Sequence, residues 1–170
     1  MHNYLILNFK TYPEASGDKA LDLARIVDKL AGKTKLKLTI CPQTADIYRL
    51  REHFPHLSIW SQHIDNIAPG RNTGWTSAST ITMAGANGTL INHSEHKVGL
   101  QAIEQTIQLC KQYHLSSCVA VPDAELGSKV APFRPDFLAY EPEELISGEH
   151  SLIDTDIDAA KLFIEKTKNA

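Results

Sequence analysis

The sequence lacks the motifs that mark nucleotide-binding, membrane-spanning and secreted proteins. No G-x-G-x-x-G follows the first apolar run, and no G-x-x-x-x-G-K-[ST] occurs anywhere in the chain. No apolar run approaches the ~20 residues that a membrane span needs. The opening residues, Met1-His2-Asn3-Tyr4, lack the basic flank of a signal peptide. We therefore expect a cytoplasmic protein without a membrane partner.

The chain also has little net charge and few cysteines. Seventeen Lys and Arg residues against twenty Asp and Glu residues give a formal charge of −3, which is too balanced for a nucleic-acid binder. The three cysteines, Cys41, Cys110 and Cys118, are odd in number and share no spacing typical of metal sites. They are typical of core thiols in a reducing compartment.

What the chain does contain is enough apolar sequence for a folded domain. Apolar residues make up 42% of the 170 residues and charged residues 22%, which excludes a disordered tail and a fibrous repeat. Because one domain usually takes about 100–200 residues, residues 1–170 are expected to form a single domain.

Six short apolar runs recur along the chain. Most of them are nearly continuous rather than alternating, as in parallel strands covered on both faces. The predicted strands span Tyr4–Phe9, Leu36–Cys41, Leu57–Ser61, Gly88–Asn92, Ser117–Val121 and Asp136–Tyr140.

Helical patterns lie between these runs and after the last one. The first helix is expected to have Ser16 as its N-cap and Gly32 at its end. Its apolar face is predicted to consist of Leu23, Ile26, Val27 and Leu30. Further helices are predicted over 100–112 and 159–166, with two shorter ones over 77–86 and 123–130.

The alternation of strands and helices predicts a parallel α/β sheet with right-handed crossovers. Two architectures fit this order: an open doubly wound sheet, or part of an eight-fold (β/α)8 barrel. A complete barrel needs about 200 residues or more, and this chain contains six βα units.

Polar residues follow several of the predicted strands. Any one of them is more often a solvated loop residue than a functional one. They are Asn8 and Lys10 after the first strand, Gln62 and His63 after the third, His93-Ser94-Glu95 after the fourth, and Glu141 after the sixth. The carboxyl ends of parallel strands are where active sites collect. At these positions an amine would hold a negatively charged substrate, an imidazole would act as an electrophile, and a carboxylate would act as a base. Together these groups can move a proton at the carbon next to a carbonyl.

These same segments carry a resemblance to a known family. Asn8-Phe9-Lys10, Asn92-His93-Ser94-Glu95 and Ala139-Tyr140-Glu141-Pro142 resemble the signature segments of the triose-phosphate isomerases, in the right order and each after its own strand. The stretches 62–65, 69–74 and 141–146 are similar to the shorter archaeal-type members. The resemblance covers the whole chain and implies the (β/α)8-barrel fold, here with six units.

The resemblance implies an activity and a set of roles. The activity is the interconversion of glyceraldehyde 3-phosphate and dihydroxyacetone phosphate through an enediolate, with no metal or organic cofactor. Glu141 corresponds to the general base and His93 to the neutral imidazole that polarises the substrate oxygens. Lys10 corresponds to the cation that draws in the dianionic substrate, and Asn8 to a hydrogen-bond donor.

The resemblance also implies supporting residues. Ser94 would hold Glu141 while the site is open, and Glu95 would pair with Lys10. Ile146 and Ser147 correspond to substrate-binding residues of the closing loop, where the Ser147 N–H would face the phosphate. Thr73 corresponds to a residue that reaches into a neighbouring subunit, so a homo-oligomer, a dimer or a tetramer, is expected.

Two departures from the family pattern affect these expectations. The hinge that usually reads Gly-Thr-Gly is Ser147-Gly148-Glu149 here, and Glu149 adds a negative charge near the phosphate position. The sequence stops before the seventh and eighth strands of the family, with their phosphate-binding loops. We expect a truncated isomerase, rather than a chain completed by another chain or a rearranged open sheet. The first and sixth strands would then be open edges.

Three possible functions differ in the support that the residues give them. The intact Asn8, Lys10, His93 and Glu141 favour the isomerase. The missing phosphate loops favour a barrel remnant that acts as a non-enzymatic oligomerising scaffold. A different aldose–ketose isomerase on a related barrel is the third, and no residue favours it. The His93-x-x-His96 spacing lacks a third ligand, so no metal is expected.

Overall fold

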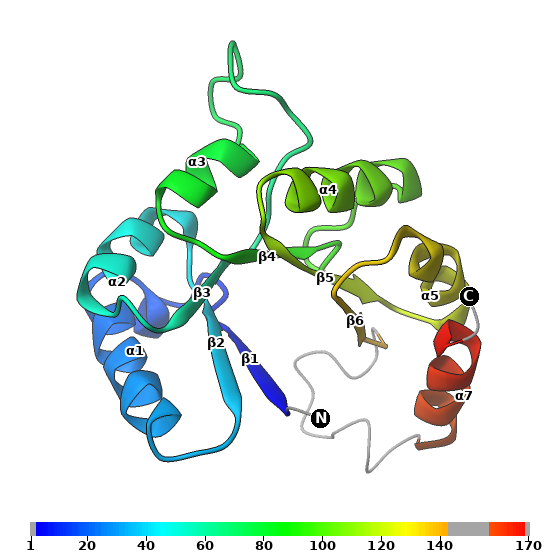
Figure 1. Cartoon of the computed structure of the whole chain (residues 1–170), viewed down its shortest axis with the longest axis horizontal. Helices are drawn as coiled ribbons and strands as arrows, with labels where there is room; N and C mark the ends of the chain where they lie inside the picture. Colours follow the sequence, from blue (N-terminus) through cyan, green and yellow to red (C-terminus); the bar gives the residue numbers. More distant parts are fainter. Residues whose placement is uncertain (1–2, 143–156, 169–170) are drawn as a thin grey trace. The chain divides into compact units, whose positions relative to one another are not determined.

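The computed structural model, drawn as a ribbon in Figure 1, describes residues 3–142 and 157–168. These residues divide into two compact units. The first unit contains residues up to 90 together with 109–116, and the second contains 91–108 and the described residues from 117 onward. The single domain expected from the length stays a prediction, and each unit is described by itself.

The first unit contains four parallel strands in chain order and the helices between them. Its elements are β1 (Tyr4–Asn8), η1 (Pro13–Ala15), α1 (Asp18–Ala31), β2 (Lys37–Cys41), η2 (Thr44–Asp46), α2 (Ile47–His53), β3 (Ser58–Ser61), α3 (Ala78–Met83) and β4 (Gly88–Ile91), whose last residue belongs to the second unit. The register aligns Tyr4 with Lys37, Thr39 with Ser58 and Trp60 with Gly88.

The second unit contains the other pair of strands. Its elements are α4 (Leu100–Gln112), β5 (Ser116–Val121), α5 (Ala124–Val130), η3 (Ala131–Phe133), β6 (Phe137–Tyr140) and α7 (Ile157–Lys168), with the last turn of α4 and Ser116 assigned to the first unit. β5 and β6 pair in parallel, with Cys118 opposite Phe137. The six predicted strands are therefore confirmed, and each observed end lies within one residue of the predicted one.

Burial explains why the apolar runs form strands. Residues 38–41 of β2, all of β4 and residues 117–121 of β5 are buried, as expected for strands covered on both faces. β1 differs, because the side chains of Tyr4 and Leu5 are 45% and 46% exposed. The three cysteines are free and buried, as predicted.

The start of α1 differs from the prediction. The N-cap is Gly17 rather than Ser16, and the Ser16 hydroxyl instead donates to the Tyr12 carbonyl oxygen at 2.8 Å. Gly17 has φ +60, a conformation that favours glycine, and its N–H donates to the buried Asp46 carboxylate at 3.0 Å. The expected serine cap is therefore wrong, because the N-cap position falls on Gly17 and the Ser16 hydroxyl is engaged with Tyr12. Gly32 ends the helix as predicted.

A short helix, α2, was not predicted between the second and third strands. Its Arg51 guanidinium donates to the carbonyl oxygens of Gly85 at 2.8 Å, Pro55 at 2.7 Å and Leu57 at 2.9 Å. Burial lowers the pKa of Arg51. Arg51 thus ties α2 to the loops that precede β3 and β4.

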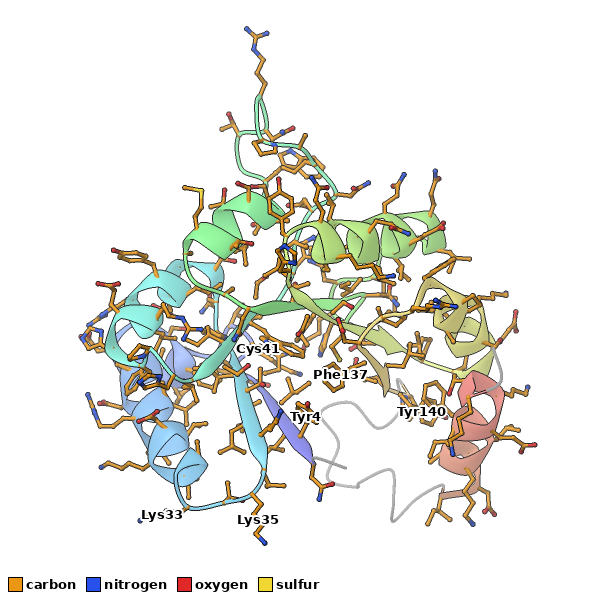
Figure 2. All side chains as sticks on the ribbon, in the orientation of Figure 1. Tyr4, Lys33, Lys35, Cys41, Phe137 and Tyr140 are labelled. Atoms are coloured by element: carbon orange, nitrogen blue, oxygen red, sulfur yellow. The ribbon has the colours of Figure 1, made fainter. Side chains whose placement is uncertain are left out.

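In the second unit, α7 packs on α5 and on β6. Tyr140 of β6 stacks on Phe163 of α7 with ring centroids 4.9 Å apart, and Figure 2 shows Tyr140 beside that helix. Asp123 caps α5 by accepting the Leu126 N–H at 2.7 Å. In the described part of the chain, no helix is long and apolar enough to cross a membrane.

Candidate active site

His93 and Glu141 face each other in the second unit. His93 follows the end of β4 and Glu141 follows the end of β6. The distance from His93 Nε2 to Glu141 Oε1 is 3.7 Å, and the side chains are 13% and 28% exposed. This distance is too long for a hydrogen bond between them. A largely buried imidazole and a partly buried carboxylate therefore lie side by side without a hydrogen bond between them.

Two groups of Glu95 lie near His93 Nδ1: its N–H donates to this nitrogen at 3.2 Å, and its carboxylate oxygen Oε2 is 3.6 Å away. The donated N–H favours a lone pair on Nδ1, and in a neutral ring the proton is then on Nε2. Nε2 is also the nitrogen near Glu141. The geometry presents one N–H donor next to one carboxylate oxygen.

A small cavity of about 10 Å³ lies beside Glu141, with room for about one water molecule. Asn92, Ser94, Lys97, Ala120, Val121, Pro122 and Glu141 line it. Ser94 Oγ and Glu141 Oε2 are both buried and make no hydrogen bond within the described residues. The hydrogen bond predicted between Ser94 and Glu141 is therefore not formed here, although both side chains border the same cavity.

The Glu141 carboxylate also affects the pKa of Cys118 in β5. Burial and, second, the charge of Glu141 raise the pKa of the Cys118 thiol from 9.0 to about 12. Cys118 therefore stays a neutral thiol beside the carboxylate and does not act as a nucleophile at ordinary pH.

Lys10 and Asn8 come together in the first unit. Lys10 has φ +49, which is strained for a residue other than glycine. Its N–H donates to Asn8 Oδ1 at 2.9 Å. The Gln62 side-chain amide donates to the carbonyl oxygens of Lys10 at 2.8 Å and Cys41 at 3.0 Å. Gln62 thus holds the strained residue from the end of the third strand, a role that its place in the sequence alone did not indicate.

Thr73 lies in the segment 66–76, which stands out from the ribbon between β3 and α3 (Figure 1). Asp65 closes this segment at its base, because its N–H donates to the Thr76 carbonyl oxygen at 2.8 Å and its carboxylate accepts the Thr76 N–H at 2.6 Å. Thr73 is exposed, and the neighbouring Trp75 is 61% exposed.

For the remaining predicted site residues, the structure gives no contacts that test their roles. Ile146 and Ser147 lie outside the described residues. Lys10 and Glu95 belong to different units, so their pairing stays a prediction. Over residues 3–142 and 157–168, no cluster of three His, Cys, Asp or Glu side chains is arranged to hold a metal ion.

The comparisons with known proteins agree with this fold. The solved triosephosphate isomerase of Bartonella henselae matches 78% of this chain and 58% of its own length, with a TM-score of 0.64 and 18% identity. The parallel βα units therefore place the chain in the (β/α)8-barrel class. Residues 3–170 match the family model described as triosephosphate isomerase. The chain belongs to the triosephosphate isomerase family.

Archaeal relatives support the same assignment. A triosephosphate isomerase of Methanobrevibacter smithii is 44% identical over 142 residues, which cover 84% of this chain and 64% of that relative. One from Methanothermobacter thermautotrophicus is 37% identical over 164 residues, covering 92% of this chain and 71% of the relative. The chain thus spans just under two thirds of the first of these proteins.

Proposed function

We propose that this chain carries the catalytic groups of a triose-phosphate isomerase, which interconverts glyceraldehyde 3-phosphate and dihydroxyacetone phosphate. The observation that supports it most is the facing pair in the second unit, Nε2–H of His93 and the carboxylate of Glu141, 3.7 Å apart. Family membership supports the same substrate. As part of this proposal, the reaction belongs to glycolysis or gluconeogenesis and takes place in the cytoplasm.

The reaction that this pair suits is a proton transfer beside a carbonyl. Glu141 takes the proton from the carbon next to the carbonyl, and the electron pair of that C–H bond forms the enediolate. The Nε2–H of His93 donates to the oxygen on which negative charge grows. Glu141 then returns the proton to the neighbouring carbon. Meanwhile His93 Nε2 gives its proton to the former carbonyl oxygen and takes the proton of the neighbouring hydroxyl, whose oxygen becomes the new carbonyl. This pairing of a carboxylate base with a neutral histidine is the known mechanism of the family.

Lys10 and Asn8 provide the electrostatic part of the proposal. The Lys10 ammonium attracts the dianionic substrate, and Asn8 adds a hydrogen bond. The bonds from Asn8 and Gln62 to the Lys10 backbone support a fixed position for this strained residue. Ile146 and the Ser147 N–H are proposed for the substrate phosphate.

A homo-oligomer belongs to the same proposal. The exposed Thr73 and Trp75, on a segment that Asp65 closes at its base, suit contact with a second copy of the chain. No nucleic-acid or membrane partner is proposed.

Removal of the proposed base tests the function. Glu141→Gln should lower kcat by about 10²–10⁴-fold in a coupled isomerase assay, because the amide cannot accept the substrate proton. Glu104→Gln, on the exposed face of α4, removes the same charge away from the site and should leave kcat unchanged. Equal kcat for Glu141→Gln and the unmodified chain would refute the role. A folded chain that oligomerises but does not isomerise the substrate would favour the scaffold.

A further inference from the structure

Asn92, the residue between β4 and His93, has an unusual backbone conformation. Its φ is +59, and its side chain lies in the interior with the residue only 6% exposed. Asn adopts this left-handed conformation more readily than most residues that have a Cβ. A glycine would satisfy the backbone at lower cost, so the amide side chain needs its own explanation.

The Asn92 side chain makes two hydrogen bonds to backbone groups. Its Nδ2 donates to the Ala120 carbonyl oxygen of β5 at 2.8 Å. Its Oδ1 accepts the Val98 N–H at 2.9 Å. The second bond closes the turn 93–97, which contains His93 and Glu95. One buried amide therefore fastens this turn at both ends and ties it to the neighbouring strand.

The end of β5 also holds Glu141, in this case through a backbone hydrogen bond. The Glu141 N–H donates to the Val121 carbonyl oxygen at 2.8 Å. Successive carbonyls of a strand point to opposite sides, so Ala120 and Val121 reach the two neighbours of β5 in turn. The histidine turn is thus fastened to one carbonyl of β5 through Asn92, and the glutamate to the next carbonyl.

We propose that Asn92 is a positioning residue for His93: its amide fixes the turn 93–97 on β5 and so sets the distance between His93 Nε2 and Glu141 Oε1. The proposal rests on the proposed function of this pair. Without the amide, the turn loses its bond to β5 and its closure at Val98. The Glu95 N–H, which donates to His93 Nδ1, then loses its fixed position.

The test uses the full 170-residue chain with three variants. Asn92→Gly keeps the left-handed backbone and removes both side-chain bonds. Asn92→Ala removes the bonds and also disfavours the backbone conformation. Asn87→Ala is the matched control, because Asn87 precedes β4 at its other end and its Oδ1 accepts the Ile59 N–H at 3.1 Å. All three lose side-chain bonds to the backbone, but only the Asn92 variants change the histidine turn.

Two measurements separate positioning from simple support of the fold. The first is the ¹⁵N NMR signal of the His93 ring, assigned with His93→Gln. In the unmodified chain the ring should be the Nε2–H tautomer, and Asn92→Gly should shift it toward a mixture. The second is isomerase kinetics, where Asn92→Gly should lower kcat by about 10²-fold, the cost of misplacing a catalytic group by about 1 Å, with KM little changed. Asn87→Ala should lower only the melting temperature.

The outcomes separate this proposal from the function on which it rests. Asn92→Gly with unchanged His93 ring signals and unchanged kcat would overturn the positioning role and leave the isomerase function standing. A chain without any isomerase activity would refute the function, and the ring signals of Asn92→Gly would then still decide the position of His93. An equal change of the ring signals in Asn87→Ala would overturn the proposal as well, because both changes would then reflect stability alone.

Discussion

The shifted pKa of Cys118 makes the stability of the chain depend on alkaline pH. The thiol titrates near 9.0 when unfolded and near 12 when folded, because burial and the Glu141 charge disfavour the thiolate. Its contribution is therefore complete below pH 9 and is lost as the pH rises from 9 toward 12. Across this window the free energy of unfolding should fall as the pH rises, because the unfolded chain loses the thiol proton before the folded chain does.

Cys118→Ala supplies the control for this effect, since other groups also titrate at alkaline pH. Urea unfolding at pH 8 and pH 10.5 should show a larger loss of stability in the unmodified chain than in Cys118→Ala. Equal losses would mean that the thiol is not responsible. Glu141→Gln should reduce the effect, because it removes the second of the two causes.

The sequence pointed to the side chains proposed for catalysis more readily than to the residues that hold them. His93 and Glu141 were found because a titratable group directly after a strand is visible in the pattern. The roles of Gln62 and Asn92 depend on side-chain bonds to carbonyls of other strands. A single sequence carries no signal for such bonds, because both partners are common polar groups.

Among the elements, the strands were predictable and the helix faces less so. The apolar face predicted for α1 was wrong in part: Val27 is buried, but Ile26 and Leu30 are 57% and 51% exposed. The buried face consists of Ala20, Leu21, Ala24 and Val27. Small alanines allow the helix to approach the sheet closely, and a pattern search for large apolar residues overlooks them. The short α2 escaped detection for the related reason that seven residues show too little periodicity.

The contact between α5 and α7 leads to a prediction about Gly127. A Cβ at this position would lie 2.6 Å from Phe163 Cε2 and 3.0 Å from Thr167 Cγ2. Phe163 is buried and stacked on Tyr140, so it cannot move aside freely. Gly127→Ala should lower the free energy of unfolding by about 1–2 kcal/mol, because overpacking outweighs the gain of about 1 kcal/mol in helix propensity.

Chemical unfolding of two further variants checks this reasoning. Gly99→Ala meets no atom within 4 Å, so it should cost only the modest amount by which alanine is less favourable than glycine at the helix position before Leu100. Gly127→Ala combined with Phe163→Leu should lose less than the sum of the two single changes, since the smaller side chain makes room for the methyl group. Full additivity would mean that the two residues do not compete for the same space.

At the scale of the whole molecule, two exposed apolar surfaces differ in kind. One is the segment 66–76 with Trp75. The other is the free side of β1, where Tyr4 is exposed and labelled in Figure 2. β1 pairs with β2, and within the described part of the first unit no strand pairs with its other side. A protruding segment suits a closed contact between two copies, whereas an unpaired strand edge recruits further chains without limit.

We therefore expect two separable kinds of association. Light scattering after size-exclusion chromatography should show a discrete oligomer that Trp75→Ala shifts toward the monomer, because the largest apolar side chain of the segment is lost. Met83→Ala removes another exposed apolar side chain, 81% exposed on α3, and should leave the mass unchanged. Tyr4→Glu should instead suppress larger aggregates and the binding of a hydrophobic dye, because a charge on an edge strand opposes pairing with further chains. The Lys37 ammonium, 5.5 Å from the Tyr4 ring, is close enough to interact with the new carboxylate. If Trp75→Ala left the oligomer intact while Tyr4→Glu dissolved it, the chain would associate through its strand edge, and the proposed role of the segment 66–76 would be wrong.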